Sequence, residues 1–230
     1  MEEKPAVAHE AVDHGAQPVH HHHSHAATSR HGHGHHLLTV EDLSVSFLMY
    51  DEEAGLYYRD GKYVYPKHKT MNGKKDFWAR GDGWVLAGLA KVLKELPETD
   101  KYRPEYIDRF RTLAKSVAAC QQPEGYWTRS MLDPLHAPGP ETSGTAFFTY
   151  GLQWGINNGF LDAAEYQPVV EKAWKYLSTV ALQPDGKIGY VQPIGEKAIP
   201  GQVVDANSTS NFGVGAFLLA ACERVRYLNK

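Results

Sequence analysis

Two tryptophans flank an arginine in the segment DFWARGDGW, at residues 76 to 84. Arg80 can pair with a carboxylate through two parallel hydrogen bonds, a geometry that lysine cannot provide. Trp78 and Trp84 can cover a flat ring and exclude water from it. The alternative for the tryptophans is core packing beside a helix start, and the alternative for Arg80 is a solvated surface cation. We expect a binding site for a sugar acid here.

Acidic and hydroxyl residues open a second segment, ETSGT, at residues 141 to 145. Thr142 and Ser143 are common helix-capping residues, and capping accounts for them as well as ligand binding does. Glu141 can either fix a neighbouring side chain or contact sugar hydroxyls. A third segment, DANSTSN at residues 205 to 211, has the same character and is the weaker candidate.

Each of these segments precedes or opens a glycine-rich apolar stretch of helical length. Such stretches predict buried helices, because apolar residues occupy most of their circumference. Amphipathic stretches alternate with them and predict exposed helices with a single apolar stripe. The buried helices are expected over residues 80–96, 141–156 and 207–225, with caps at Asp82, at Thr142 and Ser143, and at Ser208 to Ser210, and the exposed helices over residues 103–122 and 162–181.

Turns built on Gly55, Gly125 and Gly186 recur ahead of these helices, at a spacing of roughly 60 to 70 residues. A repeat of this kind predicts stacked helix pairs, and a closed ring of such pairs is an α/α toroid. The inner helices then place their N-termini on one face, where free N–H groups and partial positive charge favour an anionic ligand. The sequence therefore predicts an all-α fold built of helical hairpins.

The overall composition is that of a globular domain, with 42% apolar residues and a net charge of −3. Neither sign of charge dominates, so we expect no nucleic-acid partner and no membrane-surface partner. No apolar run reaches transmembrane length and no signal-peptide core is found, so a cytoplasmic location is expected. Cys120 and Cys222 lie in apolar helical stretches, where two buried thiols are expected.

The first fifty residues differ in character from the remainder. Eleven of the thirteen histidines lie in residues 9 to 36, and residues 1–36 are predicted to be a disordered His-rich tail. Such imidazoles bind zinc, nickel or copper loosely, but no specific metal site is expected. Residues 37–47 alternate like a strand and resemble the opening of an ABC-transporter ATPase domain. No phosphate-binding loop follows, so residues 37–50 are interpreted as a foreign segment joined near Tyr50.

Four motifs in the remaining chain resemble the glycoside hydrolases of family 105 and its sister family 88. They are FWARGDGW, ETSGTAFFTYGLQWGINNG, LDAAEYQPVVEKAW and LQPDGKIGYVQP, and the resemblance runs over residues 51 to 228. It implies an (α/α)6 toroid and hydrolysis of unsaturated rhamnogalacturonyl or glucuronyl oligosaccharides, which polysaccharide lyases leave behind. It also implies that an aspartic acid protonates the vinyl ether, that water adds, and that the hemiketal collapses. Neither a metal nor another cofactor is implied.

The resemblance carries the substrate-binding tryptophan, arginine and second tryptophan of the family onto Trp78, Arg80 and Trp84. His68 is the nearest match to an active-site histidine of several family members, and its alternative is a surface loop histidine. Asp82 is a weak candidate for the catalytic acid and also suits a helix N-cap. Arg59 and Asp60 match a pattern found in part of the family, which we interpret as structural.

The family's catalytic aspartates lie upstream of the segment that begins at residue 51, so no residue here is assigned to the general acid. Residues 51–230 have room for about half of a six-pair toroid, and we expect an incomplete ring that is nearly inactive and associates through its open edge. The alternatives are a non-catalytic module that binds acidic oligosaccharides and a truncated fusion fragment.

Overall fold

The computed structural model describes residues 49–194 and 199–230. The predicted tail at residues 1–36 and the strand-like segment at 37–47 lie outside the described residues. Helices dominate the remainder, which confirms the all-α prediction. The elements are β1 (Tyr50–Asp51), β2 (Leu56–Tyr57), the short 3-10 helix η1 (Gly61–Tyr63), α4 (Ala79–Glu95), α5 (Arg103–Ala119), α6 (Thr142–Asn157), α7 (Ala163–Tyr176), the π-helical turn η2 (Leu177–Ala181) and α8 (Asn211–Leu228).

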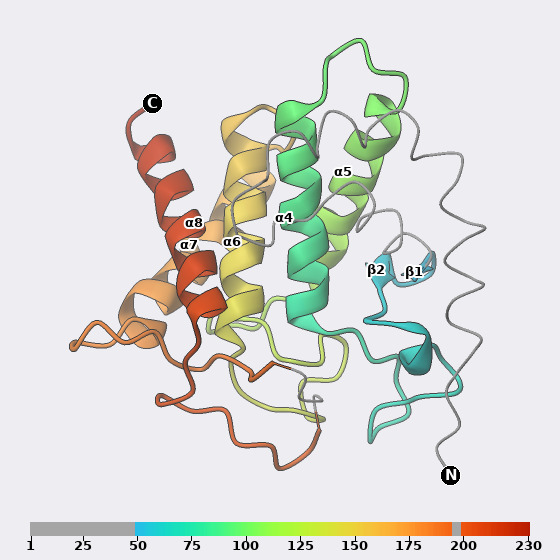
Figure 1. The fold of residues 1–230 in the computed structure, drawn as a ribbon, viewed down its shortest axis with the longest axis vertical. Helices are drawn as coiled ribbons and strands as arrows, with labels where there is room; N and C mark the ends of the chain where they lie inside the picture. The colour runs from blue at the N-terminus through green and yellow to red at the C-terminus, as the bar shows by residue number, and fades with distance from the viewer. Residues whose placement is uncertain (1–48, 195–198) are drawn as a thin grey trace.

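The helices form two layers (Figure 1). Helices α4, α6 and α8 pack side by side as the inner layer, α5 packs against α4, and α7 packs against α6. The three inner helices run in the same direction, with their N-termini at the lower end of Figure 1, and α5 and α7 return in the opposite direction. This alternation of inner and outer helices confirms the predicted helical hairpins. We call the end where the inner helices begin the N-terminal face.

Helix α4 starts earlier than the sequence predicts. Its N-cap is Trp78, whose side chain makes no capping hydrogen bond, and Asp82 lies buried in the first turn. The prediction that Asp82 caps this helix is therefore wrong. Its Oδ1 instead accepts a hydrogen bond of 2.8 Å from the backbone N–H of Tyr57, which joins β2 to α4.

Helix α6 is the centre of the fold, with nearly all of its residues buried. Its N-cap is Glu141, whose carboxylate accepts hydrogen bonds from the backbone N–H groups of Ser143 and Gly144, so the prediction that Thr142 or Ser143 caps this helix is wrong. Gly144 permits the close crossing of α4 and α6, because a Cβ atom there would lie 2.7 Å from Ala79. The two helix starts are thereby held together.

The outer helices bury one stripe each, as their amphipathic patterns predict. In α5 the stripe packs against α4 and the α6–α7 connection, and in α7 it packs against α6. The buried apolar residues are Tyr106, Phe110, Leu113, Ala114 and Val117 in α5, and Tyr166, Val170, Ala173 and Tyr176 in α7.

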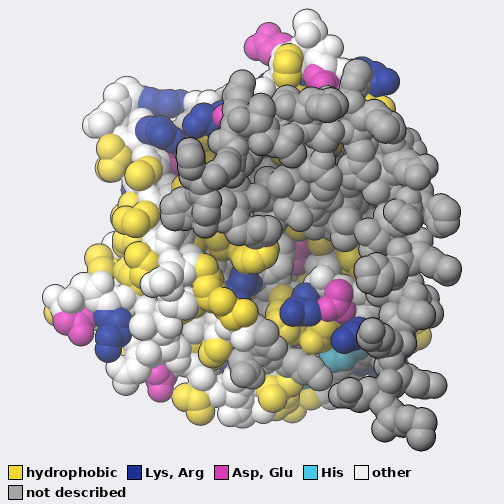
Figure 2. All heavy atoms as spheres, viewed as in Figure 1, with side chains coloured by type: hydrophobic (Ala, Val, Ile, Leu, Met, Phe, Trp, Pro, Cys, Tyr) yellow, Lys and Arg dark blue, Asp and Glu magenta, His cyan; other side chains and the backbone are white. Residues whose placement is uncertain are grey.

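One side of α8 leaves apolar residues in solvent. Four of them are substantially exposed: Val214 at 37%, Leu218 at 56%, Val225 at 55% and Leu228 at 67%. Successive members are four, seven and three residues apart, so they lie on one stripe of the helix. Figure 2 shows hydrophobic side chains gathered over this helix at the left of the view. Cys222 is exposed on the same stripe, contrary to the prediction of a buried thiol.

Both cysteines are free, and Cys120 on α5's C-terminal side is half-buried. Burial, and secondarily the charge of Asp82, raise the pKa of the Cys120 thiol to about 11. None of the helices in the described part of the chain combines the length and the apolarity that a bilayer crossing requires.

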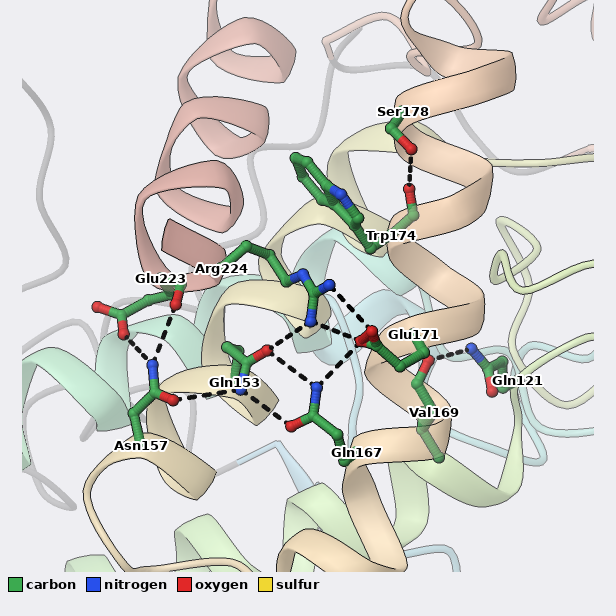
Figure 3. Close-up of polar contacts among 10 residues, drawn as sticks. All are labelled: Gln121, Gln153, Asn157, Gln167, Val169, Glu171, Trp174, Ser178, Glu223 and Arg224. Carbon is green, nitrogen blue, oxygen red and sulfur yellow. Dashed lines mark hydrogen bonds and ion pairs between the residues drawn. The ribbon is translucent and has the colours of Figure 1, made fainter. Parts of the chain in front are cut away.

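A polar network joins the last three helices (Figure 3). Arg224 of α8 binds both carboxylate oxygens of Glu171 in α7, with Nη2 at 2.9 Å from Oε1, and also donates to Gln153 Oε1 of α6 at 3.2 Å. Asn157 donates to Glu223 Oε2 at 2.9 Å. These contacts fix the position of α8 against the layer and hence the place of its N-terminus.

Candidate functional site

The N-terminal face gathers the segments that the sequence singles out. The starts of α4, α6 and α8 lie together there, and the loops that precede them run across the same end of the molecule (Figure 1). Backbone contacts hold these loops together: Ala79 N–H donates to the carbonyl of Arg129 at 3.0 Å, and Thr142 N–H donates to the carbonyl of Tyr190 at 2.8 Å. In Figure 2 basic, acidic and histidine side chains surround hydrophobic ones toward the lower part of the view.

Arg80 lies in the first turn of α4 with its guanidinium turned toward the protein. Its Nε donates to Ser143 Oγ at 3.0 Å, and its two terminal nitrogens donate to the carbonyl oxygens of Gln192 and Pro193. The guanidinium lies over the ring of Phe212, 4.3 Å from its centroid, and the side chain is only 13% exposed. Most of its donors are therefore used within the chain.

A buried acid holds Arg80 in this position. Glu141 is fully buried and accepts hydrogen bonds from Ser143 Oγ, from Gly144 N at 2.9 Å and from Gln192 N at 2.9 Å. Its Oε1 lies 4.0 Å from Arg80 Nε. Of the two roles that the sequence leaves open for Glu141, the structure places it in the first, the fixing of a neighbour.

Thr142 and Ser143 are also fully buried. Thr142 Oγ1 donates to the carbonyl of Gly189 at 2.6 Å and lies 2.8 Å from the hydroxyl of Tyr176. These contacts tie the start of α6 to α7 and to the loop after η2. Glu141, Thr142 and Ser143 are therefore buried below the N-terminal face, where their hydrogen bonds hold its loops and Arg80 in position.

The two tryptophans do not enclose Arg80 as the motif suggests. Trp78 is buried, with its ring edge-on to Tyr63 at 5.1 Å, and the cation above it is Arg59, whose Cζ lies 5.1 Å from its centroid. The indole Nε1 of Trp78 is buried and has no hydrogen-bond partner among the described residues. Trp84 is 36% exposed and lies edge-on to Phe147, 6.5 Å away.

His68 belongs to the same cluster as Trp78, because its ring lies 4.8 Å from that of Tyr63. Its Nε2 lies 2.8 Å from Oδ2 of the buried Asp76, whose Oδ1 accepts a hydrogen bond of 2.9 Å from Ser130 Oγ. The side chain of His68 remains 32% exposed. The carboxylate thus orients the imidazole while leaving one edge of the ring toward solvent.

The site contains positive charge in two places. Burial lowers the pKa of the Arg80 guanidinium, Glu141 opposes that shift, and the charge of Arg59 adds to it, so Arg59 and Arg80 lie near enough to interact. Burial also lowers the pKa of Arg129, with Glu141 opposing. Arg129 Nη1 donates a hydrogen bond of 2.7 Å to Gln202 Oε1.

Asp82 is completely buried, and burial raises the pKa of its carboxyl well above the ordinary value of 3.8, although the hydrogen bond from Tyr57 opposes the shift. This burial argues against the predicted catalytic role, because a residue without exposed surface cannot contact a substrate. Within residues 49–194 and 199–230 no three His, Cys, Asp or Glu side chains are grouped as metal ligands.

The sequence interpretation missed Asp76 and gave Arg59 only a structural role. A signal for Asp76 exists, since it opens the tryptophan motif itself. Arg59 offers no comparable signal, because its place over Trp78 depends on how the loop between β2 and α4 folds back.

Comparison with known proteins identifies close relatives. The family model described as Glycosyl Hydrolase Family 88 matches residues 9–228. A curated protein from Formosa agariphila, named Unsaturated 3S-rhamnoglycuronyl hydrolase, is 42% identical over 179 residues, which are 76% of this chain and 46% of that protein. The chain therefore spans about half the length of this curated relative.

Solved structures agree. One described as a glycosyl hydrolase family 88 protein from Bacteroides vulgatus is 75% identical, with a TM-score of 0.78 over 80% of this chain and 53% of that one. Another, named Polysaccharide Lyase, is 90% identical, with a TM-score of 0.79 over 83% of this chain and 54% of that one. Structures described as members or possible members of family 105, at 22–24% identity and TM-scores of 0.61–0.66, share the fold over 80–82% of this chain and 48–56% of their own length. These neighbours are (α/α)6 toroids, which agrees with the partial toroid that the sequence predicts.

Proposed function

We propose a function from one premise: the chain belongs to Glycosyl Hydrolase Family 88, whose model matches residues 9–228. The proposed activity is that of a glycosidase for oligosaccharides that end in an unsaturated uronic acid. The name of the Formosa agariphila relative supports this substrate class. In this reaction water adds to the vinyl ether of the terminal ring, and the hemiketal that forms breaks down to release the next sugar.

The N-terminal face is the proposed substrate site. Its supporting observation is the pair of arginines: Arg80, fixed by Glu141 through Ser143, and Arg59, stacked on Trp78. Guanidinium groups pair well with carboxylates, and aromatic rings pack against sugar rings. The exposed indole of Trp84 provides a further apolar surface at the start of α4.

The general acid is not assigned to a residue of this chain. Asp82 and Glu141 are fully buried, and Glu141 already accepts several hydrogen bonds. A positioned acid contributes about 10²- to 10⁴-fold to a rate. We therefore expect this chain alone to bind the substrate and to turn it over slowly.

The test is to incubate the purified chain with a lyase-generated unsaturated disaccharide and to follow the ultraviolet absorbance of its conjugated double bond. Loss of absorbance, with release of the reducing sugar, supports the hydrolase. Binding in a titration without any loss of absorbance supports the alternative, a non-catalytic binding module. Absence of both binding and turnover contradicts the proposal.

A polysaccharide lyase is a second candidate activity, because the structure that carries this name is 90% identical to the chain. In the same assay, the two activities change the absorbance in opposite directions. A lyase acting on a saturated uronate polysaccharide creates the double bond and raises the absorbance, whereas a hydrolase acting on the cleaved product lowers it.

A further inference from the structure

Arg59 presents a stacked but largely unoccupied guanidinium at the N-terminal face. Its Cζ lies 5.1 Å from the centroid of Trp78 and 5.9 Å from that of Tyr63, and the side chain is 43% exposed. Within the described residues its only hydrogen-bonded partner is the carboxylate of Asp60, at 2.5 Å from Nη1. The rings hold the planar cation in place, so its remaining N–H groups are directed along its edge.

The guanidinium of Arg80 is less available to a ligand than that of Arg59. Ser143 and the carbonyl oxygens of Gln192 and Pro193 take hydrogen bonds from all three of its nitrogens, and its side chain is 13% exposed. A ligand anion that paired with Arg80 would have to displace these contacts. Arg59 needs to release only Asp60.

The pair between Arg59 and Asp60 is easily exchanged. Both side chains are more than one-third exposed, so water screens their attraction and the pair contributes little to stability. Asp60 also keeps a second role when Arg59 is released, because its Oδ1 accepts a hydrogen bond of 2.8 Å from Lys62 N at the start of η1. The carboxylate of Asp60 thus occupies the position that a ligand oxyanion would take.

Further aromatic and polar groups adjoin Arg59. The rings of Trp78 and Tyr63 lie beneath its guanidinium, and the ring of Tyr63 lies 4.8 Å from that of His68. His68 is held by Asp76 through Nε2, which leaves its other ring nitrogen for a further contact. A ligand bound at the edge of Arg59 would therefore lie beside an aromatic cluster that includes a partly exposed imidazole.

From these contacts we infer that Arg59, rather than Arg80, is the residue that binds the oxyanion of the substrate, with Trp78 and Tyr63 beneath the guanidinium and Asp60 as the group displaced. The oxyanion is a carboxylate or a sulfate ester on a sugar, both of which match the edge of a guanidinium. Arg80 then acts as a fixed neighbouring charge. This inference rests on the proposed function and specifies which residue selects its anionic substrate.

The experiment compares affinities by isothermal titration for the wild type, Arg59→Gln and Arg59→Lys. The probe is an unsaturated glucuronyl disaccharide, with its methyl ester as the uncharged counterpart. Loss of the charge-assisted hydrogen bonds should weaken binding of the acid about 10- to 100-fold in Arg59→Gln and leave the ester nearly unaffected. Arg59→Lys should recover only part of the affinity, because an ammonium group cannot bind bidentately.

Two further variants sharpen the result. Asp60→Asn removes the competing carboxylate, so it should bind the acid more tightly than the wild type. Arg226→Gln is the matched control, because Arg226 is exposed and is paired with Glu223 on α8. Its affinity should remain that of the wild type.

The source of the oxyanion is distinguished by a third probe, a sulfate ester of a neutral sugar. Weaker binding of the uronate alone in Arg59→Gln identifies a carboxylate, and weaker binding of the sulfate ester alone identifies a sulfate. Unchanged affinity of Arg59→Gln for every probe overturns the inference. If the wild type still hydrolyses the disaccharide in that case, the proposed function stands, whereas a wild type that neither binds nor cleaves it refutes both.

Discussion

Buried carboxylates at the N-terminal face differ in how fully the protein satisfies them. Glu141 accepts hydrogen bonds from three backbone N–H groups and one hydroxyl. Asp82 accepts one, from Tyr57 N–H, and its second oxygen has no partner in the described part of the chain. An ionised carboxylate in that position is costly, so Asp82 favours its protonated form.

Asp82 should therefore make the stability depend on pH. In the unfolded chain the carboxyl ionises near 3.8, and in the folded chain it keeps its proton to a higher pH. The folded state binds more protons in this window, so the free energy of unfolding should fall as pH rises from 3.8 toward the folded-state pKa. Asp82→Asn keeps the acceptor for Tyr57 and cannot ionise, so its free energy of unfolding should not show this decrease with rising pH.

Chemical denaturation at a series of pH values measures this difference. The same substitution at Asp185, which is exposed in a turn, is the control and should leave the pH dependence in place. Parallel stability curves for the wild type and Asp82→Asn would contradict the assignment of a protonated Asp82.

At the scale of elements, the N-terminal face depends on how closely α4 and α6 approach each other. Gly144 sits in the first turn of α6, and a methyl group there would meet both the backbone and the Cβ of Ala79. Helix α4 also carries Arg80, one residue further on, so a shift at this crossing would displace the arginine relative to Ser143. The glycine thus connects helix packing to site geometry.

Gly144→Ala should reduce the free energy of unfolding by about 1–3 kcal/mol, because rigid backbone cannot yield to the added methyl group. Gly81→Ala is the matched control, since Gly81 also lies in the first turn of an inner helix and has open space around it. That change should stabilise the protein by about 0.5–1 kcal/mol. Thermal or urea denaturation of the two variants tests the contrast, and equal effects would refute it.

The sequence predicted these elements better than their ends. Periodicity identifies the five α-helices of the described residues, because burial of an apolar face imposes a helical spacing on the sequence. The turn glycines mark where they are separated, because Gly55, Gly125 and Gly186 adopt a positive φ. Capping depends on tertiary partners that no local pattern contains. The hydroxyl of Thr142 donates a hydrogen bond to the carbonyl of Gly189, so Glu141 caps α6 instead. The carboxylate of Asp82 accepts a hydrogen bond from Tyr57 of β2 and does not cap α4. The pairing of Arg59 with Trp78 likewise depends on a loop that folds back from β2.

At the scale of the whole molecule, the inner layer of the described residues ends at α8, which buries one side and exposes the other. Helix α8 buries Gly213, Ala216, Phe217 and Ala220 against its neighbours and exposes its apolar stripe to solvent. Contiguous apolar surface of this kind is typical of an interaction site. The exposed stripe agrees with an incomplete ring.

We expect the chain to self-associate through this stripe. Leu218→Lys places a charge at its centre and should shift the sedimentation coefficient toward that of a monomer at concentrations where the wild type associates. Val180→Lys, at an exposed apolar position of the η2 turn that is not part of the stripe, is the control and should leave association unchanged. A wild type that sediments as a monomer at all accessible concentrations would contradict the prediction.

Cys222 lies within this stripe, three residues before Val225 and four after Leu218, and is exposed, while the pKa of about 11 keeps the half-buried Cys120 almost entirely in the unreactive thiol form at neutral pH. The chain thus carries a natural attachment point for a maleimide dye on the side of the helix that we expect to meet a second molecule. Fluorescence from a label there would change when that side becomes covered, so the assembly could be followed without an engineered cysteine.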